Sequence, residues 1–238
     1  SSQKVEALKD VSFDVEEGEY IAIMGESGSG KTTLLNILAS LDKPTSGEVL
    51  LDGKDLTKIS DKHISAFRRD NLGFVFQDFN LLDTFNVADN IYLPLVLSKE
   101  PYALMKPKLE KLARSLGINH LLEKYPYEIS GGQKQRLAIA RAIAKNPDIY
   151  IFDDSFSALD FKTDAKLRQE LNQLVKKTKS TVLLVGQRIA SIMDADQIIV
   201  LDEGRIVGKG THEELMKSCQ VYQEIAYSQL SKEELSHE

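Results

Sequence analysis

The chain has 238 residues, enough for one large α/β domain or two small ones with a sizeable core. Its hydrophobic content of 42% and charged content of 28% are ordinary for a soluble globular protein, and neither a transmembrane run nor a signal peptide is expected. The net charge of −6 argues against a nucleic-acid surface, and the single cysteine, Cys219, excludes an intramolecular disulfide and suits a reducing compartment.

Two strands are predicted before the first motif. Apolar and polar residues alternate over residues 5–15, which predicts a half-exposed strand before a turn at residues 16–18. Residues 20–24 are a short apolar run of the kind that forms a buried strand.

A glycine-rich loop follows at residues 25–32, which fit the pattern G-x-x-x-x-G-K-[ST] at every fixed position. Residues 33–39 are apolar at helical spacing, so the motif has the strand–loop–helix context that it requires. In such a loop, backbone N–H groups and the helix N-terminus face phosphate oxygens, Lys31 adds a charge between the β- and γ-phosphates, and the Thr32 hydroxyl can ligate Mg²⁺. A glycine-rich turn with a chance lysine is the competing interpretation. The loop residues expected to bind nucleotide are Gly25, Glu26, Ser27, Gly28, Ser29, Gly30, Lys31, Thr32 and Thr33.

Short elements occupy the next forty residues. Turns at residues 43–48 and 52–53 flank a short strand, residues 49–51, and residues 61–70 have the pattern of a short polar helix. An apolar strand, residues 73–76, then ends at Gln77.

Helical patterns dominate residues 86–124, where Pro94, Pro101 and Pro107 are expected to break them. This stretch is interpreted as a helical insertion between parts of an α/β core. A set of ordinary crossover helices is the alternative.

A Ser-Gly-Gly turn precedes the next helix, residues 134–144, with Ser130 as the expected N-cap. A serine-capped helix N-terminus with two glycines can bind an anion, although the same sequence also makes ordinary loops. The candidate residues are Ser130, Gly131, Gly132 and Gln133.

Two carboxylates end the apolar run at residues 149–152, which predicts a buried parallel strand. Open α/β sheets place their ligands at the carboxyl ends of such strands. Asp153 is therefore expected to hold Mg²⁺ through its water shell and Asp154 to lie beside the attacking water. Solvated acids in a loop are the alternative.

The remaining elements alternate between helix and strand. An amphipathic helix is predicted over residues 163–177, then a buried strand over residues 181–185 that leads to Gln187. A hairpin is predicted from residues 197–201 and 205–207, and Thr211 with Glu214 fits a capping box.

The set of motifs in this order resembles the ATP-binding-cassette (ABC) ATPases, and the resemblance covers nearly the whole chain. By that resemblance, residues 25–32 are the Walker A loop, Gln77 the Q-loop, residues 130–133 the signature, residues 149–153 the Walker B strand, residues 157–160 the D-loop and Gln187 the switch position. It implies an α/β P-loop NTPase fold with a mainly parallel sheet, an antiparallel β subdomain and a helical subdomain. The whole chain, residues 1–238, would form one domain, with the core and β subdomain at residues 1–80 and 145–238 and the helical subdomain at about residues 81–144.

The resemblance also implies a mechanism. ATP and Mg²⁺ are the expected cofactors, and two chains are expected to meet head to tail with each ATP between the Walker A loop of one and the signature of the other. A membrane permease is the expected second partner, at the cytoplasmic face of the cell membrane, and no nucleic acid is expected. The expected catalytic residues are Lys31, Asp154 and Gln187, and the expected metal ligands are Thr32, Gln77 and Asp153.

Three departures from the family pattern affect the expected mechanism, two by weakening hydrolysis and one by weakening nucleotide binding. Asp154 stands where active members usually have Glu, and it is one methylene shorter, so it would hold the attacking water less well. Gln187 stands where the family usually has His, and Gln cannot carry a proton or a positive charge near neutral pH. The family's adenine-stacking aromatic lies upstream of residues 5–10, but no aromatic residue precedes Phe13 here. Stacking worth roughly 1–3 kcal/mol is therefore expected to be missing, with a reduced affinity for ATP.

The resemblance differs between the two parts of the chain. Residues 4–145 are similar to the ATPase subunits of macrolide exporters, lipoprotein-release systems and bacitracin-type peptide-resistance transporters. Residues 150–228 are similar to the nucleotide-binding domains of bacterial multidrug exporters. An engineered chimera joined near the Walker B strand is one hypothesis, and a natural protein of intermediate type is the other.

Two other functions stay open on the sequence. One is a degenerate or engineered nucleotide-binding module with little or no turnover, as the pair Asp154 and Gln187 suggests. The other is a cassette ATPase outside transport, in DNA repair or translation, against which the single cassette and the acidic charge balance argue.

Overall fold

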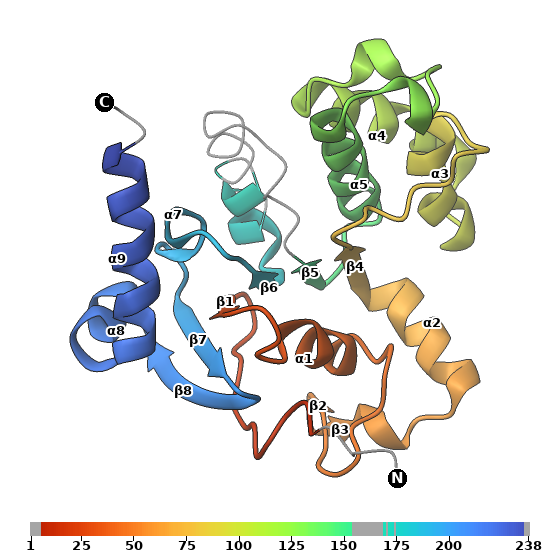
Figure 1. Ribbon diagram of the computed structural model, residues 1–238. Helices are drawn as coiled ribbons and strands as arrows, with labels where there is room; N and C mark the ends of the chain where they lie inside the picture. Colours follow the sequence, from red (N-terminus) through yellow and green to blue (C-terminus); the bar gives the residue numbers. More distant parts are fainter. Residues whose placement is uncertain (1–5, 154–168, 170, 174, 236–238) are drawn as a thin grey trace, which may run out of the picture. The chain divides into compact units, whose positions relative to one another are not determined.

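The structure is a computed structural model, and it describes residues 6–153, 169, 171–173 and 175–235 (Figure 1). Two compact units make up the chain. The first unit comprises residues 1–57 and 181–238, and the second comprises residues 58–180. The predicted amphipathic helix at residues 163–177 lies mostly outside the described residues.

A mostly parallel sheet forms the centre of the first unit. Strand β1 (Tyr20–Gly25) lies between β6 (Thr181–Val185) and β7 (Gln197–Asp202), both parallel to it, and β8 (Arg205–Gly210) pairs antiparallel with β7. The inner strands are apolar because both of their faces are covered, as is usual for parallel strands. The predicted strands at residues 20–24 and 181–185 and the predicted hairpin are confirmed.

The first unit also contains α1 (Lys31–Leu38), α7 (Ile189–Ile192), α8 (His212–Ser218) and α9 (Gln220–Leu235), the last of which contacts α7 and β7 (blue in Figure 1). The predicted capping box starts α8. The hydroxyl of Thr211 accepts a hydrogen bond from the Glu214 amide at 3.3 Å, and the Glu214 carboxylate accepts one from the Thr211 amide at 2.8 Å.

A small hairpin lies after α1, where the sequence predicted a strand over residues 49–51 and a turn at residues 52–53 but no second strand. Strands β2 (Leu50–Leu51) and β3 (Lys54–Asp55) pair antiparallel, and a 3₁₀ turn, η1 (Leu56–Lys58), follows. Asp52 and Gly53 have φ of 49° and 74°, so both turn residues adopt the left-handed conformation that matches the twist of a two-residue hairpin.

The strand predicted over residues 5–15 is wrong for the described residues, 6–15, which form no strand. The alternation itself is present, because Val11, Phe13 and Val15 are half-buried while the residues between them are exposed. Asp10 has φ of 52°, a left-handed conformation that interrupts an extended run before it can pair along its length.

The second unit pairs β4 (Leu72–Val75) with β5 (Ile149–Asp153) in parallel, with Val75 opposite Phe152. Its helices are α2 (Asp61–Asn71), α3 (Val87–Leu97), α4 (Tyr102–Ser115) and α5 (Gly131–Ala144), with 3₁₀ turns η2 (Asn119–Leu121) and η3 (Pro126–Glu128). Helices α3 and α4 both contact α5, whose central residues are fully buried (green and yellow in Figure 1). The expected helical subdomain, residues 81–144, lies within this unit, and its boundaries stay a prediction.

Of the three prolines that were expected to break helices in the described part of this unit, Pro94, Pro101 and Pro107, one does so. Pro101 separates α3 from α4, but Pro94 and Pro107 lie inside these helices, so the predicted breaks there are wrong. Each helix keeps its course because it packs an apolar face, with Leu95 in α3 and Leu109 in α4 almost fully buried. Most of the stability of a helix in a protein comes from such packing.

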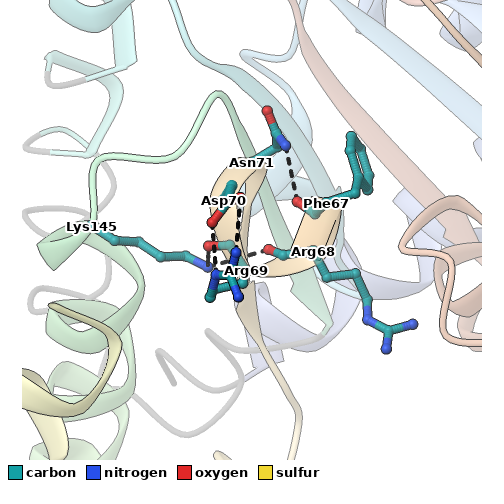
Figure 2. Close-up of polar contacts among 6 residues, drawn as sticks. All are labelled: Phe67, Arg68, Arg69, Asp70, Asn71 and Lys145. Carbon is teal, nitrogen blue, oxygen red and sulfur yellow. Dashed lines mark hydrogen bonds and ion pairs between the residues drawn. The ribbon is translucent and has the colours of Figure 1, made fainter. Parts of the chain in front are cut away.

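A lysine at the end of α5 holds the end of α2. The Lys145 ammonium donates to the carbonyl oxygens of Arg69 at 2.9 Å and Arg68 at 3.4 Å, while Arg69 and Asp70 form an ion pair at 2.8 Å (Figure 2). These carbonyls belong to the last turn of α2, where backbone oxygens lack intrahelical donors. Burial lowers the pKa of Lys145 to about 8, although the negative charge of Asp70 acts in the opposite direction and raises it.

Candidate nucleotide-binding site

The loop between β1 and α1 needs glycine at two positions for different reasons. Gly30 has φ of 103°, and a Cβ there would lie 2.7 Å from the carbonyl oxygen of Ala7. Gly28 has φ of 83°, but a Cβ there would meet nothing within 4 Å. Gly28 is therefore required by backbone conformation alone, and Gly30 by both conformation and space.

Backbone hydrogen bonds from the β7–β8 turn anchor one side of the loop between β1 and α1. The Gly204 amide donates to the Ser29 carbonyl at 3.1 Å, and the Gly204 carbonyl accepts from the Lys9 amide at 2.7 Å. Ser29 itself is buried, while Glu26, Ser27 and Gly28 are exposed. The loop is thus anchored on one side and open on the other.

Lys31 is the first residue of α1, and its side chain reaches back into the loop. Its ammonium donates to the carbonyl oxygens of Gly25 and Glu26, both at 2.6 Å, and its side chain is largely buried. The backbone of the loop therefore places a full positive charge at its own centre. No acidic residue lies in the first turn of α1. The positive charge of Lys31 and the dipole of the helix therefore both favour binding of an anion at this N-terminus.

Two hydroxyls follow the lysine in the first turn of α1. Thr32 is exposed and Thr33 is half-buried. Gly30 is the N-cap of α1 and has no side chain, so no side-chain cap competes for the first N–H groups of the helix. An exposed hydroxyl beside these donors has the oxygen chemistry that suits Mg²⁺.

Gln187 lies next to this loop in the first unit. Strand β6 runs parallel to β1, and the Gly186 amide donates to the Ile23 carbonyl at 3.2 Å. Gln187 is exposed and follows directly, at the same carboxyl edge of the sheet at which the loop begins. The structure thus brings the predicted switch residue and the phosphate loop together.

Gln77 and Asp153 lie close together in the second unit. They follow or end the parallel strands β4 and β5, in which Val75 lies opposite Phe152, so both are at the carboxyl edge of this strand pair. Gln77 is exposed and Asp153 is buried. Asp154 and residues 157–160 lie outside the described residues.

An arginine that the sequence did not single out fixes the segment after Gln77. Phe79 and Asn80 have φ of 62° and 44°, and their carbonyl oxygens each accept a hydrogen bond from Arg141 at 2.7 Å. Burial lowers the pKa of Arg141. The sequence feature that could have pointed to Arg141 is that it is the one charged residue in an alanine-rich, otherwise apolar stretch of α5.

The signature residues begin α5 as the sequence predicted. The Ser130 hydroxyl accepts from the Gln133 amide at 3.3 Å, and the Gln133 side chain accepts from the Ser130 amide at 2.9 Å. Ser130 and Gly131 are exposed, Gly132 is half-buried, and a Cβ at Gly131 would meet nothing within 4 Å. This helix N-terminus is open to an anion or to another chain.

The predicted metal ligands do not form an all-protein cage. Among the described residues, no three His, Cys, Asp or Glu side chains gather as they would around a bound metal. Thr32 lies in the first unit and Gln77 and Asp153 in the second, and each offers an oxygen ligand of the hard type that Mg²⁺ prefers.

Comparison with known proteins identifies the family. Residues 8–157 match the family model described as ABC transporter. The chain is 44% identical over 201 residues to the ABC transporter ATP-binding protein YxdL of Bacillus subtilis, covering 84% of this chain and 78% of that protein. It is 42% identical to the bacitracin export ATP-binding protein BceA of Halalkalibacterium halodurans, covering 85% and 80%. The predicted join near residue 150 finds no support in these alignments.

Solved structures agree with the sequence relatives. The dimeric post-hydrolysis structure of the ATP-binding cassette MJ0796 with ADP and Pi superposes with a TM-score of 0.84 at 36% identity, covering 89% of this chain and 93% of that one. A bacterial Atm1-family ABC exporter with ATP bound gives a TM-score of 0.82 at 29% identity, covering 94% of this chain and 39% of that one. The chain therefore belongs to the ABC transporter family, and it is an α/β P-loop ATPase that serves as an ATP-binding transporter subunit.

Proposed function

We propose that this chain binds Mg-ATP at residues 25–33, hydrolyses it slowly, and uses the cycle to drive a membrane permease. The observation that carries the proposal is the position of Lys31, held at the centre of an anchored and outwardly open loop by the carbonyls of Gly25 and Glu26. An ammonium so placed can turn from these carbonyls to phosphate oxygens without leaving the loop.

Oxygen donors of this chain fit a magnesium ion. Thr32, Gln77 and Asp153 would hold it together with phosphate oxygens, since Mg²⁺ is usually bound by one or two carboxylates plus substrate phosphates. When bound, the ion supplies neutralisation of the charge that develops on the phosphates.

Slow hydrolysis is proposed from two side chains. Asp154 is shorter than Glu and would hold the attacking water less well, and Gln187 can donate a hydrogen bond to the γ-phosphate without adding a charge. Both replacements reduce the stabilisation of the transition state more than they reduce the binding of ATP. We therefore expect them to lower kcat and to leave KM near normal.

A second cassette chain is proposed to complete the site. The similar structures of MJ0796 are dimeric, and Ser130 and Gly131 of this chain are exposed at a helix N-terminus that would face the phosphates of a partner-bound ATP.

A permease is proposed to contact the helices of the second unit. Four large apolar side chains are exposed around the end of α3 and the start of α4: Val96 (56%), Leu97 (56%), Tyr102 (88%) and Leu104 (54%). Clusters of this kind usually mark a protein or membrane interaction site. None of the described helices has the length and apolar content to cross a bilayer. Through the permease, the chain is proposed to work at the inner face of the membrane.

The testing experiment is steady-state Mg-ATP turnover of the chain beside the double variant Asp154→Glu/Gln187→His. We expect the double variant to be at least about 10-fold faster, in line with the effect of a well-placed general base. Equal and slow rates would contradict the proposed cause of weak turnover, and an undetectable rate in both with intact ATP binding would favour a binding module.

A further inference from the structure

The last helix of the first unit presents one face to the interior of that unit. Tyr222 and Ala226 of α9 are almost completely buried, and Gln229 follows at the next position of the same stripe, since residues spaced by four and seven share a helix face. Gln229 is half-buried. The packing of α9 therefore fixes the position of Gln229, unlike that of a residue on an exposed helix face.

The amide of Gln229 makes two hydrogen bonds to the segment after β6. Its nitrogen donates to the carbonyl oxygen of Gln187 at 2.5 Å, and its oxygen accepts from the amide of Ile189 at 2.8 Å. One side chain thus spans the backbone on both sides of Arg188. Ile189 is the first residue of α7, whose N-cap side chain makes no capping hydrogen bond, so Gln229 supplies the cap.

The other end of the same segment is fixed by β1. The Gly186 amide donates to the Ile23 carbonyl at 3.2 Å, and a Cβ at Gly186 would lie 2.6 Å from the Ile192 side chain. Gln187 therefore lies between two restraints, one from the strand that leads into the phosphate loop and one from α9. Its own side chain is exposed.

We propose that Gln229 is a positioning residue for Gln187, so that α9 sets where the switch side chain meets the terminal phosphate of ATP. The inference rests on the proposed function, in which Gln187 contacts that phosphate. A reacting geometry tolerates little displacement, and a shift of about 1 Å can cost about 100-fold in rate. Because Gln229 binds the backbone of Gln187, the restraint is independent of which side chain occupies position 187.

The chain offers a matched control on the same helix. Gln223 is also half-buried, and its amide nitrogen also donates to a backbone carbonyl, that of Met216, at 2.8 Å. Gln229→Met and Gln223→Met each remove one amide from α9 at nearly constant volume. Gln229→Glu keeps an acceptor for Ile189 but faces the Gln187 carbonyl with a second acceptor, so we expect it to resemble Gln229→Met.

The experiment measures kcat, the KM for ATP, and hydrogen exchange of the Ile189 amide in the three variants. We expect Gln229→Met to lower kcat about 10-fold with KM within about 2-fold, and to speed exchange at Ile189 while the Gly186 amide stays protected. Gln223→Met should change none of these by more than about 2-fold. Equal losses in both variants, or unchanged exchange at Ile189, would overturn the inference.

A Gln187→Ala variant separates this inference from the function on which it rests. Unchanged kcat in Gln187→Ala would contradict the proposed role of Gln187 itself. A lowered kcat there, with normal kcat in Gln229→Met, would overturn only the positioning role. If both roles hold, adding Gln229→Met to Gln187→Ala should cost little more, because the two residues act through one group.

Discussion

Single glycines decide the shape of the phosphate loop, and two of them can be compared directly. Gly30 and Gly28 both have positive φ, but only at Gly30 would a Cβ meet a backbone oxygen, that of Ala7. We expect Gly30→Ala to lower the free energy of unfolding by about 3 kcal/mol and Gly28→Ala by about 1–2 kcal/mol. Urea unfolding of both variants measures the difference, and equal losses would show that the contact with Ala7 is relieved at no cost.

The charge of Lys145 makes the stability of the chain depend on pH. Burial lowers its pKa from 10.5 to about 8, so between these values the unfolded chain holds a proton that the folded chain has lost. The free energy of unfolding should therefore rise from pH 8 to pH 9.5. Above pH 10 the buried Tyr222, whose pKa is raised to about 12, acts in the opposite direction, because its folded form then holds the extra proton.

Urea titrations of the parent chain and of Lys145→Met over this range isolate the effect. We expect the rise with pH to be lost in Lys145→Met and kept in Lys111→Met, which removes an exposed lysine of α4. The same slope in all three proteins would mean that Lys145 is charged in the folded chain throughout.

At the scale of elements, α5 organises the second unit. Its N-terminus carries the signature, its middle packs against α3 and α4, and its Arg141 holds the segment after Gln77 in a left-handed conformation. Removing this side chain takes the donor away from the carbonyls of Phe79 and Asn80, the two residues with positive φ.

We expect Arg141→Met to cost about 2–4 kcal/mol in the free energy of unfolding and to speed amide exchange over residues 77–82. Arg136→Met, on the same helix, is the matched control and should cost less than about 1 kcal/mol. A small and equal loss in both would mean that the loop keeps its conformation without Arg141.

At the scale of the whole molecule, the proposed site is incomplete in one chain. We expect ATP to shift the protein from monomer to dimer, most clearly with hydrolysis suppressed, while ADP does not. Gly131→Glu should block this shift without harming the fold, since a Cβ at Gly131 has open space around it. Light scattering with each nucleotide measures the mass, and a dimer in the Gly131→Glu variant would contradict the proposed interface.

Residue types along the chain were enough to predict the family, the loop at residues 25–32, the capping box of Thr211 and Glu214, Ser130 as an N-cap, and the hairpin at residues 197–207. These features are local, because each depends on residue types at fixed short spacing: glycine where φ is positive, an ammonium after the loop, a hydroxyl three residues before its partner. Resemblance in six such places is enough to specify an ABC ATPase.

Features that depend on contacts between residues far apart in the sequence became visible in the folded chain. Residues 6–15 alternate like a strand but form none, since pairing needs a partner strand and an uninterrupted backbone. Pro94 and Pro107 stay within helices because packing outweighs one lost hydrogen bond. The restraints from Arg141 and Gln229 join residues 61 or more and 40 or more positions apart, and no short-range pattern in a single sequence records which backbone carbonyl a distant side chain will reach.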